Sequence, residues 1–267
     1  MDLRRARGAA DRGRAAGHAA LSAPAEAAVG IVSDLWRFPV KSFGGERARR
    51  AFVGPFGILG DRRCAVVDAE GNPLTARRAH ALLGFRAACA DADAGEGVHV
   101  TTPEGWELPW DDPGVADEVG RALGAPVSLV RSAVGVHDAA PVQLLTTASL
   151  TAAQEWVGGE EIDRRRFRAN LIVDLDEPEP FAEAGWVGRS LAIGDGGPVL
   201  QVVSPTERCA ITTFDPDTLE RDNRVLAGLA RNRENLFGVY ARVARPGWVS
   251  VGATVALAAS PASLVAR

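Results

Sequence analysis

The sequence predicts a β-rich α+β fold with two consecutive barrel-like domains. Short runs of strand-forming residues recur about every ten residues, which is typical of a barrel or compact β-sheet domain. The 267 residues are enough for one large domain or two small ones. A hydrophobic content of 46% and a charged content of 24% are those of a globular chain that can build a core.

The chain divides into three segments by composition. Residues 1–28 are rich in alanine, arginine and glycine and lack periodic hydrophobicity, so we interpret them as a disordered leader. An organelle presequence is an alternative interpretation of the same arginine-rich segment. We expect the first β-barrel-like domain at residues 29–135 and the second at residues 136–259, with the boundary near Ala139-Ala140-Pro141.

Short extended runs dominate the first domain, which we expect to contain one helix. Asp112 is suited to the N-cap, Pro113 to the first turn and Gly124 to the end of this helix. The strands expected here are 31–38, 51–53, 62–68, 74–77 and 98–102.

The second domain also alternates strands with a few helices. Thr147 or Ser149 is suited to cap a helix that runs through Trp156 and ends at Gly158. A second helix is expected at 225–231. The strands expected here are 171–175, 190–193, 199–203, 239–244 and 253–257.

Composition excludes several classes of function. The net charge of −4 offers no basic excess for nucleic acid, and no apolar run approaches the ~20 residues of a membrane span. The cysteines Cys64, Cys89 and Cys209 are widely spaced, which argues against a disulfide framework and against a structural zinc site. We therefore expect a cytoplasmic protein with no nucleic-acid or membrane partner.

Cys209 is the first candidate for chemistry. It directly follows Arg208, after the apolar run 199–203 and before the turn signal Asp215-Pro216-Asp217. A thiol acts as nucleophile or metal ligand in its thiolate form, and a neighbouring cation lowers its pKa. The alternative is a small buried hydrophobic residue at the end of a strand.

Cationic residues form a second candidate feature. In a strand, Arg166, Arg168 and Asn170 would share one face, and arginine forks bind phosphate in a bidentate manner. The alternative is a solvated charge run. Lys41 is the only lysine among 30 basic residues, and Lys41-Ser42 could join Arg62 and Arg77 in an anion site. These patterns predict a large, phosphate-bearing anionic cofactor whose reactive atom is soft.

Six segments, in this order along the chain, resemble the MOSC family, which includes the mitochondrial amidoxime-reducing component. The segments are Phe38-Pro-Val-Lys-Ser, Gly60-Asp-Arg, Leu74-Thr-Ala-Arg, Arg166-Phe-Arg-Ala-Asn, Arg208-Cys-Ala-Ile-Thr-Thr-Phe-Asp-Pro-Asp-Thr and Asn235-Leu-Phe-Gly-Val-Tyr. The resemblance implies a MOSC N-terminal β-barrel domain followed by a MOSC β-barrel domain, with the molybdenum cofactor (Mo-molybdopterin) between them.

The resemblance also implies roles for single residues. Cys209 matches the molybdenum ligand, and Asp215 lies where the family has an acid on the substrate side. Both are therefore expected to be catalytic. The expected cofactor-binding residues are Lys41, Ser42, Arg62, Arg77, Thr147, Arg166, Arg168, Asn170 and Arg208. Pro205-Thr206-Glu207 departs from many relatives, which carry a cysteine or small residues there.

The implied function is an oxidoreductase that reduces small N-hydroxylated compounds, with no role for pyridoxal phosphate. No plant-type cysteine set for a [2Fe–2S] cluster follows the second domain, so electrons are expected from separate electron-transfer proteins. One alternative is a sulfur-carrier or cofactor-handling protein with a persulfide on Cys209. A weaker alternative is a flavin-binding barrel.

Overall fold

A closed barrel of seven strands forms the larger part of the protein, for which a computed structural model describes residues 25–258. Around the barrel the strands follow the order β11, β10, β14, β13, β12, β16 and β1, and β1 pairs with β11 to close the ring. Their bounds are β1 (Ala25–Arg37), β10 (Val142–Thr146), β11 (Leu171–Leu175), β12 (Ser190–Ile193), β13 (Val199–Glu207), β14 (Leu236–Arg245) and β16 (Thr254–Ala258). The β-rich class with few helices is confirmed.

The first strand of the chain closes the barrel of the second half. β1 pairs antiparallel with β16 on one side and with β11 on the other, with bulges in both ladders. Inward-facing Val32, Leu35, Leu171, Leu200 and Val239 are fully buried in one shared core. Residues 25–28 of the expected leader belong to β1, and the rest of that leader lies outside the described residues.

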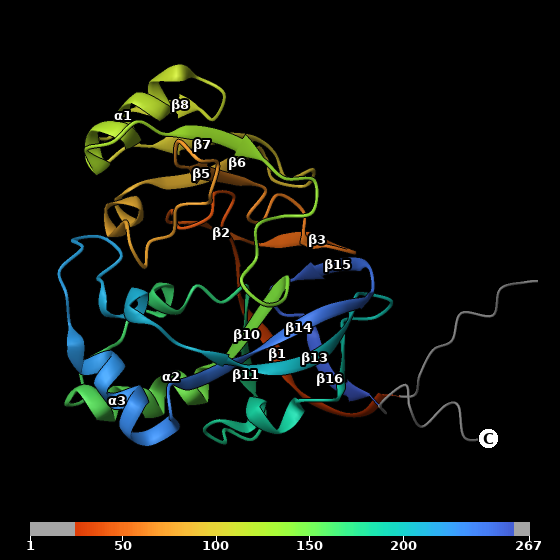
Figure 1. Ribbon diagram of the computed structural model, residues 1–267. Coiled ribbons are helices and arrows are strands. Elements are labelled where there is room, and N and C mark those ends of the chain that lie inside the picture. Colours follow the sequence, from red (N-terminus) through yellow and green to blue (C-terminus); the bar gives the residue numbers. More distant parts are fainter. Residues whose placement is uncertain (1–24, 259–267) are drawn as a thin grey trace, which may run out of the picture.

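The remaining strands form three small sheets stacked against one end of the barrel (Figure 1). These sheets join β3 (Arg50–Gly54) with β4 (Gly57–Ile58) and β15 (Gly247–Ser250), β5 (Cys64–Val67) with β9 (Ser128–Arg131), and β6 (Arg86–Asp91) with β7 (Glu96–Thr101) and β8 (Glu107–Pro109). Phe43, Val66, Phe85 and Trp110 are buried in the core that the β5–β9 and β6–β7–β8 sheets share. The buried residues of the β3–β4–β15 sheet, such as Val53 and Val249, belong to the barrel core instead. The short strand β2 (Glu46–Ala48) pairs with β1 and leads from the barrel into these sheets.

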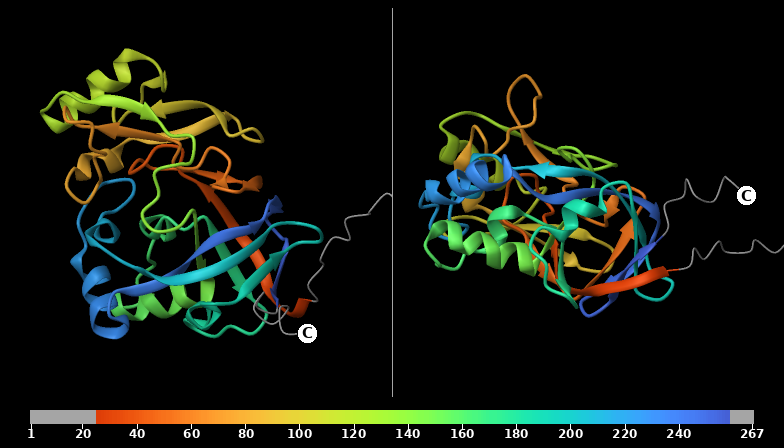
Figure 2. Two further views of the ribbon diagram at one scale, coloured as in Figure 1. Left: turned by 45° about the vertical axis from the view of Figure 1, so that its right-hand side comes forward. Right: turned by 90° about the horizontal axis from the view of Figure 1, so that it is seen from below.

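Strands from the two halves of the chain pair with each other, an arrangement that we call strand exchange. β1 comes from the first half of the chain but belongs to the barrel, whereas β15 comes from the end of the chain and pairs with β3. The left view of Figure 2 shows the β3–β15 edge lying against the barrel, and residues of both strands are buried in the barrel core. A division of the chain by sequence position therefore does not separate the two cores.

Capping residues fix the three α-helices. α1 (Pro113–Leu123) has Asp112 as its N-cap and ends at the left-handed Gly124, as predicted. α2 (Thr147–Gln154) is capped by Thr146 instead of Thr147 or Ser149, and α3 (Asn223–Arg233) is longer than predicted at both ends. No helix within residues 25–258 combines the length and apolarity needed to cross a membrane.

Short 3-10 helices replace some of the expected extended segments. The helix η3 (Arg164–Phe167) begins with Asp163, whose carboxylate accepts from the Arg165 backbone, and β11 starts only at Leu171. The prediction that Arg166, Arg168 and Asn170 alternate in a strand is therefore wrong. The expected strand 74–77 is a turn-rich segment. The other 3-10 helices are η1 (His80–Gly84), η2 (Glu155–Val157), η4 (Ala182–Trp186) and η5 (Ala210–Thr213).

Gly30 allows β1 to pair with strands on both of its sides. A Cβ at this position would lie 2.0 Å from the Asp174 backbone oxygen of β11. We expect Gly30→Ala to lower the free energy of unfolding by about 1–3 kcal/mol, because the ladder must shift to relieve the overlap. Chemical denaturation measures this change.

Gly185→Ala is the control, because a Cβ there meets no atom within 4 Å. We expect it to change the free energy of unfolding by less than about 0.5 kcal/mol. Equal stability of the Gly30→Ala variant and the wild type would contradict the tight closure of the barrel between β1 and β11.

Candidate functional site

A pocket between the barrel and the stacked sheets gathers most of the predicted site residues. Those that line it are Lys41, Ser42, Arg62, Arg77, Arg166, Arg168, Asn170, Arg208 and Cys209. The only lysine and the only tyrosine of the sequence, Lys41 and Tyr240, are both among its lining residues. We call this the cationic pocket.

Three lining residues have left-handed backbone angles. The φ values are 71° for Ser42, 51° for Arg62 and 54° for Arg168. Residues other than glycine rarely adopt this conformation, which carries a cost of about 1–3 kcal/mol and persists where surrounding contacts enforce it. Here the Arg62 backbone N–H donates to Phe38 at 2.7 Å, and that of Arg168 donates to Arg165 at 3.1 Å. Concentrated strain of this kind is typical of a binding site.

A buried polar cluster positions Arg62 and Asn170. Asp61 pairs with Arg62 and accepts a hydrogen bond from the Asn170 amide at 3.1 Å. The Asn170 amide oxygen in turn accepts from the Gln143 backbone at 3.1 Å. Arg62 also donates to the Arg168 carbonyl at 3.2 Å. The cluster therefore joins the loop after β4 to the start of β11 beneath the pocket.

Two arginines at the pocket carry guanidinium groups without a carboxylate partner among residues 25–258. Arg168 donates to the Phe43 carbonyl at 2.6 Å, and Arg208 donates to the Phe237 and Phe167 carbonyls at 2.8 and 2.7 Å. The Nη2 nitrogen of each is buried without a hydrogen-bond partner. Burial lowers the pKa of Arg168 to about 9 and that of Arg208 to about 10. An anion in the pocket would offset the charge of both groups.

The segment between β9 and β10, residues 132–141, brings a carboxylate to the same cations. Lys41 Nζ donates to Asp138 at 2.8 Å and to the Val136 carbonyl at 3.1 Å, and Arg77 lies 4.0 Å from the other Asp138 oxygen. Burial lowers the pKa of Lys41, and the hydrogen bond with Asp138 opposes that effect. Burial would raise the pKa of Asp138, but the hydrogen bond from Lys41 and the nearby cations hold it below its usual range. Asp138 thus occupies a position suited to an anionic group of a ligand.

Cys209 lies two residues after the end of β13, at the N-cap of η5, and provides the partly exposed sulfur of the pocket. Its carbonyl accepts from the backbone and the hydroxyl of Thr212, which fixes the start of η5. The interaction with its sulfur raises the pKa of the neighbouring Arg77. Burial raises the pKa of Cys64 to about 11 and that of Cys89 to about 12, so neither forms a thiolate readily.

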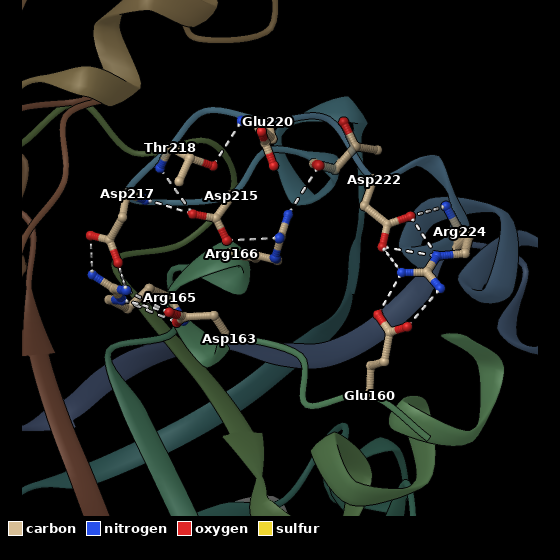
Figure 3. A network of polar contacts seen from close by, with 11 residues as sticks. Glu160, Asp163, Arg165, Arg166, Asp215, Asp217, Thr218, Glu220, Asp222 and Arg224 are labelled. Carbon is tan, nitrogen blue, oxygen red and sulfur yellow. Dashed lines mark hydrogen bonds and ion pairs between the residues drawn. The ribbon is translucent and has the colours of Figure 1, made fainter. Parts of the chain in front are cut away.

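Two predicted site residues lie outside the pocket. Asp215 caps a turn by accepting from the Asp217 and Thr218 backbone, both at 3.0 Å, and it also pairs with Arg166 (Figure 3). Thr147 donates to Asp174 at 2.6 Å at the start of α2. The catalytic assignment of Asp215 and the cofactor-binding assignment of Thr147 therefore find no support in the geometry, because each side chain serves its local structure.

The sequence analysis missed several lining residues, among them His137, Asp138, Gln143, Thr206 and Tyr240. The single tyrosine was the available signal for Tyr240, comparable to the single lysine. His137 and Asp138 carried no such signal, because their proximity to Lys41 depends on the path of the segment that links the two parts. Within residues 25–258, no three histidine, cysteine or acidic side chains cluster as metal ligands.

Comparisons with known proteins match both parts of the chain. The family model of the MOSC N-terminal beta barrel domain matches residues 29–118, and that of the MOSC domain matches residues 131–256. Mitochondrial amidoxime-reducing component 1 of Homo sapiens is 26% identical over 292 residues, covering 86% of this chain and 83% of that protein. The Mus musculus protein of the same name is 24% identical, covering 86% and 82%.

A second kind of relative is matched over only part of its length. Molybdenum cofactor sulfurase of Danio rerio is 26% identical over 266 residues, covering 78% of this chain and 31% of that protein. Among solved structures, the YUAD protein from Bacillus subtilis has a TM-score of 0.48 at 13% identity, covering 86% of this chain and 95% of that one. That structural likeness is too low to support an argument.

The exposure of the three thiols predicts selective alkylation. At about pH 8, iodoacetamide should modify Cys209 in the native protein and spare Cys64 and Cys89, because the latter are 0% and 7% exposed with raised pKa values. Intact-mass spectrometry should show one adduct per chain, and none for Cys209→Ser. Native labelling of Cys64 or Cys89 at a similar rate would contradict the described burial.

The position of Asp138 predicts that it competes with anions. We expect Asp138→Asn to strengthen the binding of inorganic phosphate by about threefold to tenfold, equivalent to about 1 kcal/mol, because Lys41 and Arg77 lose their carboxylate partner. Isothermal titration calorimetry measures the affinity. Asp93→Asn, which removes a surface carboxylate paired with Arg50, is the control and should leave it unchanged. Weaker phosphate binding by Asp138→Asn would contradict this interpretation.

Proposed function

The chain belongs to the MOSC family, and on this basis we propose that it binds the molybdenum cofactor and reduces N-hydroxylated small molecules. The relatives named for amidoxime reduction match most of their own length, which supports a reductase over other functions. The observation that carries the proposal is the accessible Cys209 sulfur in a pocket with two unneutralised guanidinium groups.

The donor set of the cationic pocket fits a phosphate-bearing pterin with a soft metal. A thiolate suits such a metal, and Cys209 is the only one of the three cysteines with a partly exposed side chain. Arg208 presents a buried nitrogen that lacks an acceptor, as an anionic ligand requires. The residues present therefore fit the proposed cofactor.

Each lining side chain has a defined task in this proposal. Cys209 would hold the molybdenum, and Lys41, Ser42 and Arg62 would surround the pterin and its phosphate. Arg77, Arg166, Arg168, Asn170 and Arg208 complete the proposed cofactor-binding set. When bound, the cofactor supplies the two-electron redox chemistry, and the protein supplies ligation, orientation and charge.

The pKa directions separate the polar groups that keep a proton from those that do not. Burial raises the pKa of Tyr240, so its hydroxyl remains protonated at neutral pH and can donate a hydrogen bond to substrate. The lowered pKa of Asp138 keeps that carboxylate ionised, so it acts as a counter-ion to Lys41 and Arg77. We therefore assign hydrogen-bond donation to Tyr240 and charge balance to Asp138.

Partners and compartment complete the proposal. Reduction of an N–O bond consumes two electrons, which we propose come from separate electron-transfer proteins. The substrate is a small molecule. The three unpaired cysteines favour a cytoplasmic location.

A second candidate function is sulfur or cofactor handling. The similarity to molybdenum cofactor sulfurase of Danio rerio and the single accessible thiol favour it. In this function Cys209 would carry a persulfide, and the cationic pocket would hold the cofactor without turnover. Mass spectrometry that finds a persulfide on Cys209 in protein without bound molybdenum would support it.

Replacement of Cys209 tests the reductase proposal. We expect the wild type to purify with about one molybdenum per chain, and Cys209→Ser to lose the metal and at least about a hundredfold in activity, because the thiolate ligand is gone. Metal analysis and reduction of a hydroxylamine, with an artificial electron donor, provide the two measurements.

Cys89→Ser is the matched control, because this buried thiol lies outside the cationic pocket, and it should retain metal and activity. A Cys209→Ser protein that still reduces the hydroxylamine would end the proposed mechanism. A wild-type protein loaded with molybdenum but inactive on N-hydroxylated compounds would favour cofactor handling.

A further inference from the structure

A second pocket lies beside the cationic pocket and shares three wall residues with it, Arg166, Arg168 and Ile211. Cys209 does not line it. Its lining residues come from both parts of the molecule: Trp36, Phe38, Gly44, Gly45, Arg47, Leu83 and Arg86 from the first half of the chain, and Arg165, Arg166, Arg168, Ile211, Phe214 and Pro216 from the second. We call it the aromatic pocket.

Flat rings form its walls. Trp36 and Phe38 are stacked with their centroids 6.4 Å apart and their planes at 19°. Phe214 is stacked on His80 at 5.2 Å and 5°, which holds this wall against η1. Neighbouring Gly44 and Gly45 place no side chain in the space. Such walls accommodate a planar ring, since aromatic groups favour offset stacking at these separations.

The charges around this pocket are unbalanced. Five of the lining residues are arginine, and none is acidic. Four of these arginines pair with aspartates: Arg47 with Asp34, Arg86 and Arg165 with Asp217, and Arg166 with Asp215. Arg168 has no carboxylate partner among residues 25–258, and its guanidinium carbon lies 4.3 Å from the Phe38 ring centroid. One cation therefore stays uncompensated at the aromatic wall.

Two buried donors on this wall also lack acceptors. Trp36 Nε1 and Arg168 Nη2 are both buried without a hydrogen-bond partner within the described part of the chain. A buried donor without an acceptor is costly, so few remain in folded proteins unless a ligand or water completes them. Both residues line the aromatic pocket, which points to an acceptor-bearing ligand there.

We propose that the aromatic pocket binds a planar aromatic carboxylate. The ring packs on Trp36, Phe38 and Phe214, and the carboxylate accepts hydrogen bonds from Arg168 and Trp36. This site is separate from the thiol chemistry, so it goes beyond the proposed reductase function. Arg166 and Arg168 line both pockets, so these side chains would lie between a ligand in the aromatic pocket and a cofactor in the cationic pocket.

Calorimetry with 2-naphthoate tests the proposal. The full chain is produced in a host without molybdenum cofactor synthesis. The measurement then does not depend on whether this protein binds the cofactor in the cationic pocket. We expect one site per chain for 2-naphthoate and at least about tenfold weaker binding of neutral 2-naphthamide, because hydrogen bonds to a charged group are the stronger ones. Inorganic phosphate should not displace 2-naphthoate.

Trp36→Phe keeps the ring but removes the Nε1 donor, and it should weaken 2-naphthoate binding by about tenfold. Trp106→Phe is the matched control at a 67% exposed tryptophan outside the pocket, and it should have no effect. Leu83→Trp places a larger side chain among the lining residues and should abolish binding. Circular dichroism verifies that each variant is folded.

Other outcomes overturn the proposal. Equal affinity for 2-naphthoate and 2-naphthamide would show an apolar cavity without anion recognition, and displacement by phosphate would show a general anion site. Loss of binding in Cys209→Ser would place the ligand in the cationic pocket. If folded Trp36→Phe and Leu83→Trp proteins both bind 2-naphthoate like the wild type, the aromatic pocket is not the binding site.

Discussion

The contacts of the buried Asp61 carboxylate hold the barrel and the stacked sheets together. It is 1% exposed and accepts hydrogen bonds from the Phe38 backbone at 2.8 Å and the Asn170 amide at 3.1 Å, and it pairs with Arg62. A charge buried this deeply requires such partners, and loss of one leaves an uncompensated ion. Because Phe38 follows β1 and Asn170 precedes β11, this one group fixes the end of the barrel, the strained loop of Arg62 and the floor of the cationic pocket.

Ion pairs with aspartates account for many of the arginines in this arginine-rich chain. Most arginines near the two pockets meet aspartates, as in the chain of contacts from Asp163 through Arg165 to Asp217 (Figure 3). Asp217 also pairs with Arg86 from the stacked sheets, which links the two parts at the surface. Exposed pairs of this kind contribute little each. Arg168 and Arg208 differ because no carboxylate within residues 25–258 neutralises them.

Local signals predicted what depends on local structure. The caps of α1 could be read from Asp112, Pro113 and Gly124, and the unusual lysine and the Arg208-Cys209 pair indicated much of the cationic pocket. The directions of the side chains from Arg166 to Asn170 could not be predicted from the sequence. Asp163 caps a 3-10 turn there, and Arg168 takes a left-handed conformation. The side chains of Asp215 and Thr147 satisfy nearby groups and do not line the cationic pocket, a local competition that residue type alone does not reveal.

The strand exchange has a consequence for synthesis of the chain. β1 is made before its partner β16. The edge of β1 that pairs with β16 therefore remains unpaired until β16 has been made, a delay typical of folds with contacts between distant segments. In the nascent chain this edge is therefore open to pairing with strands of other chains.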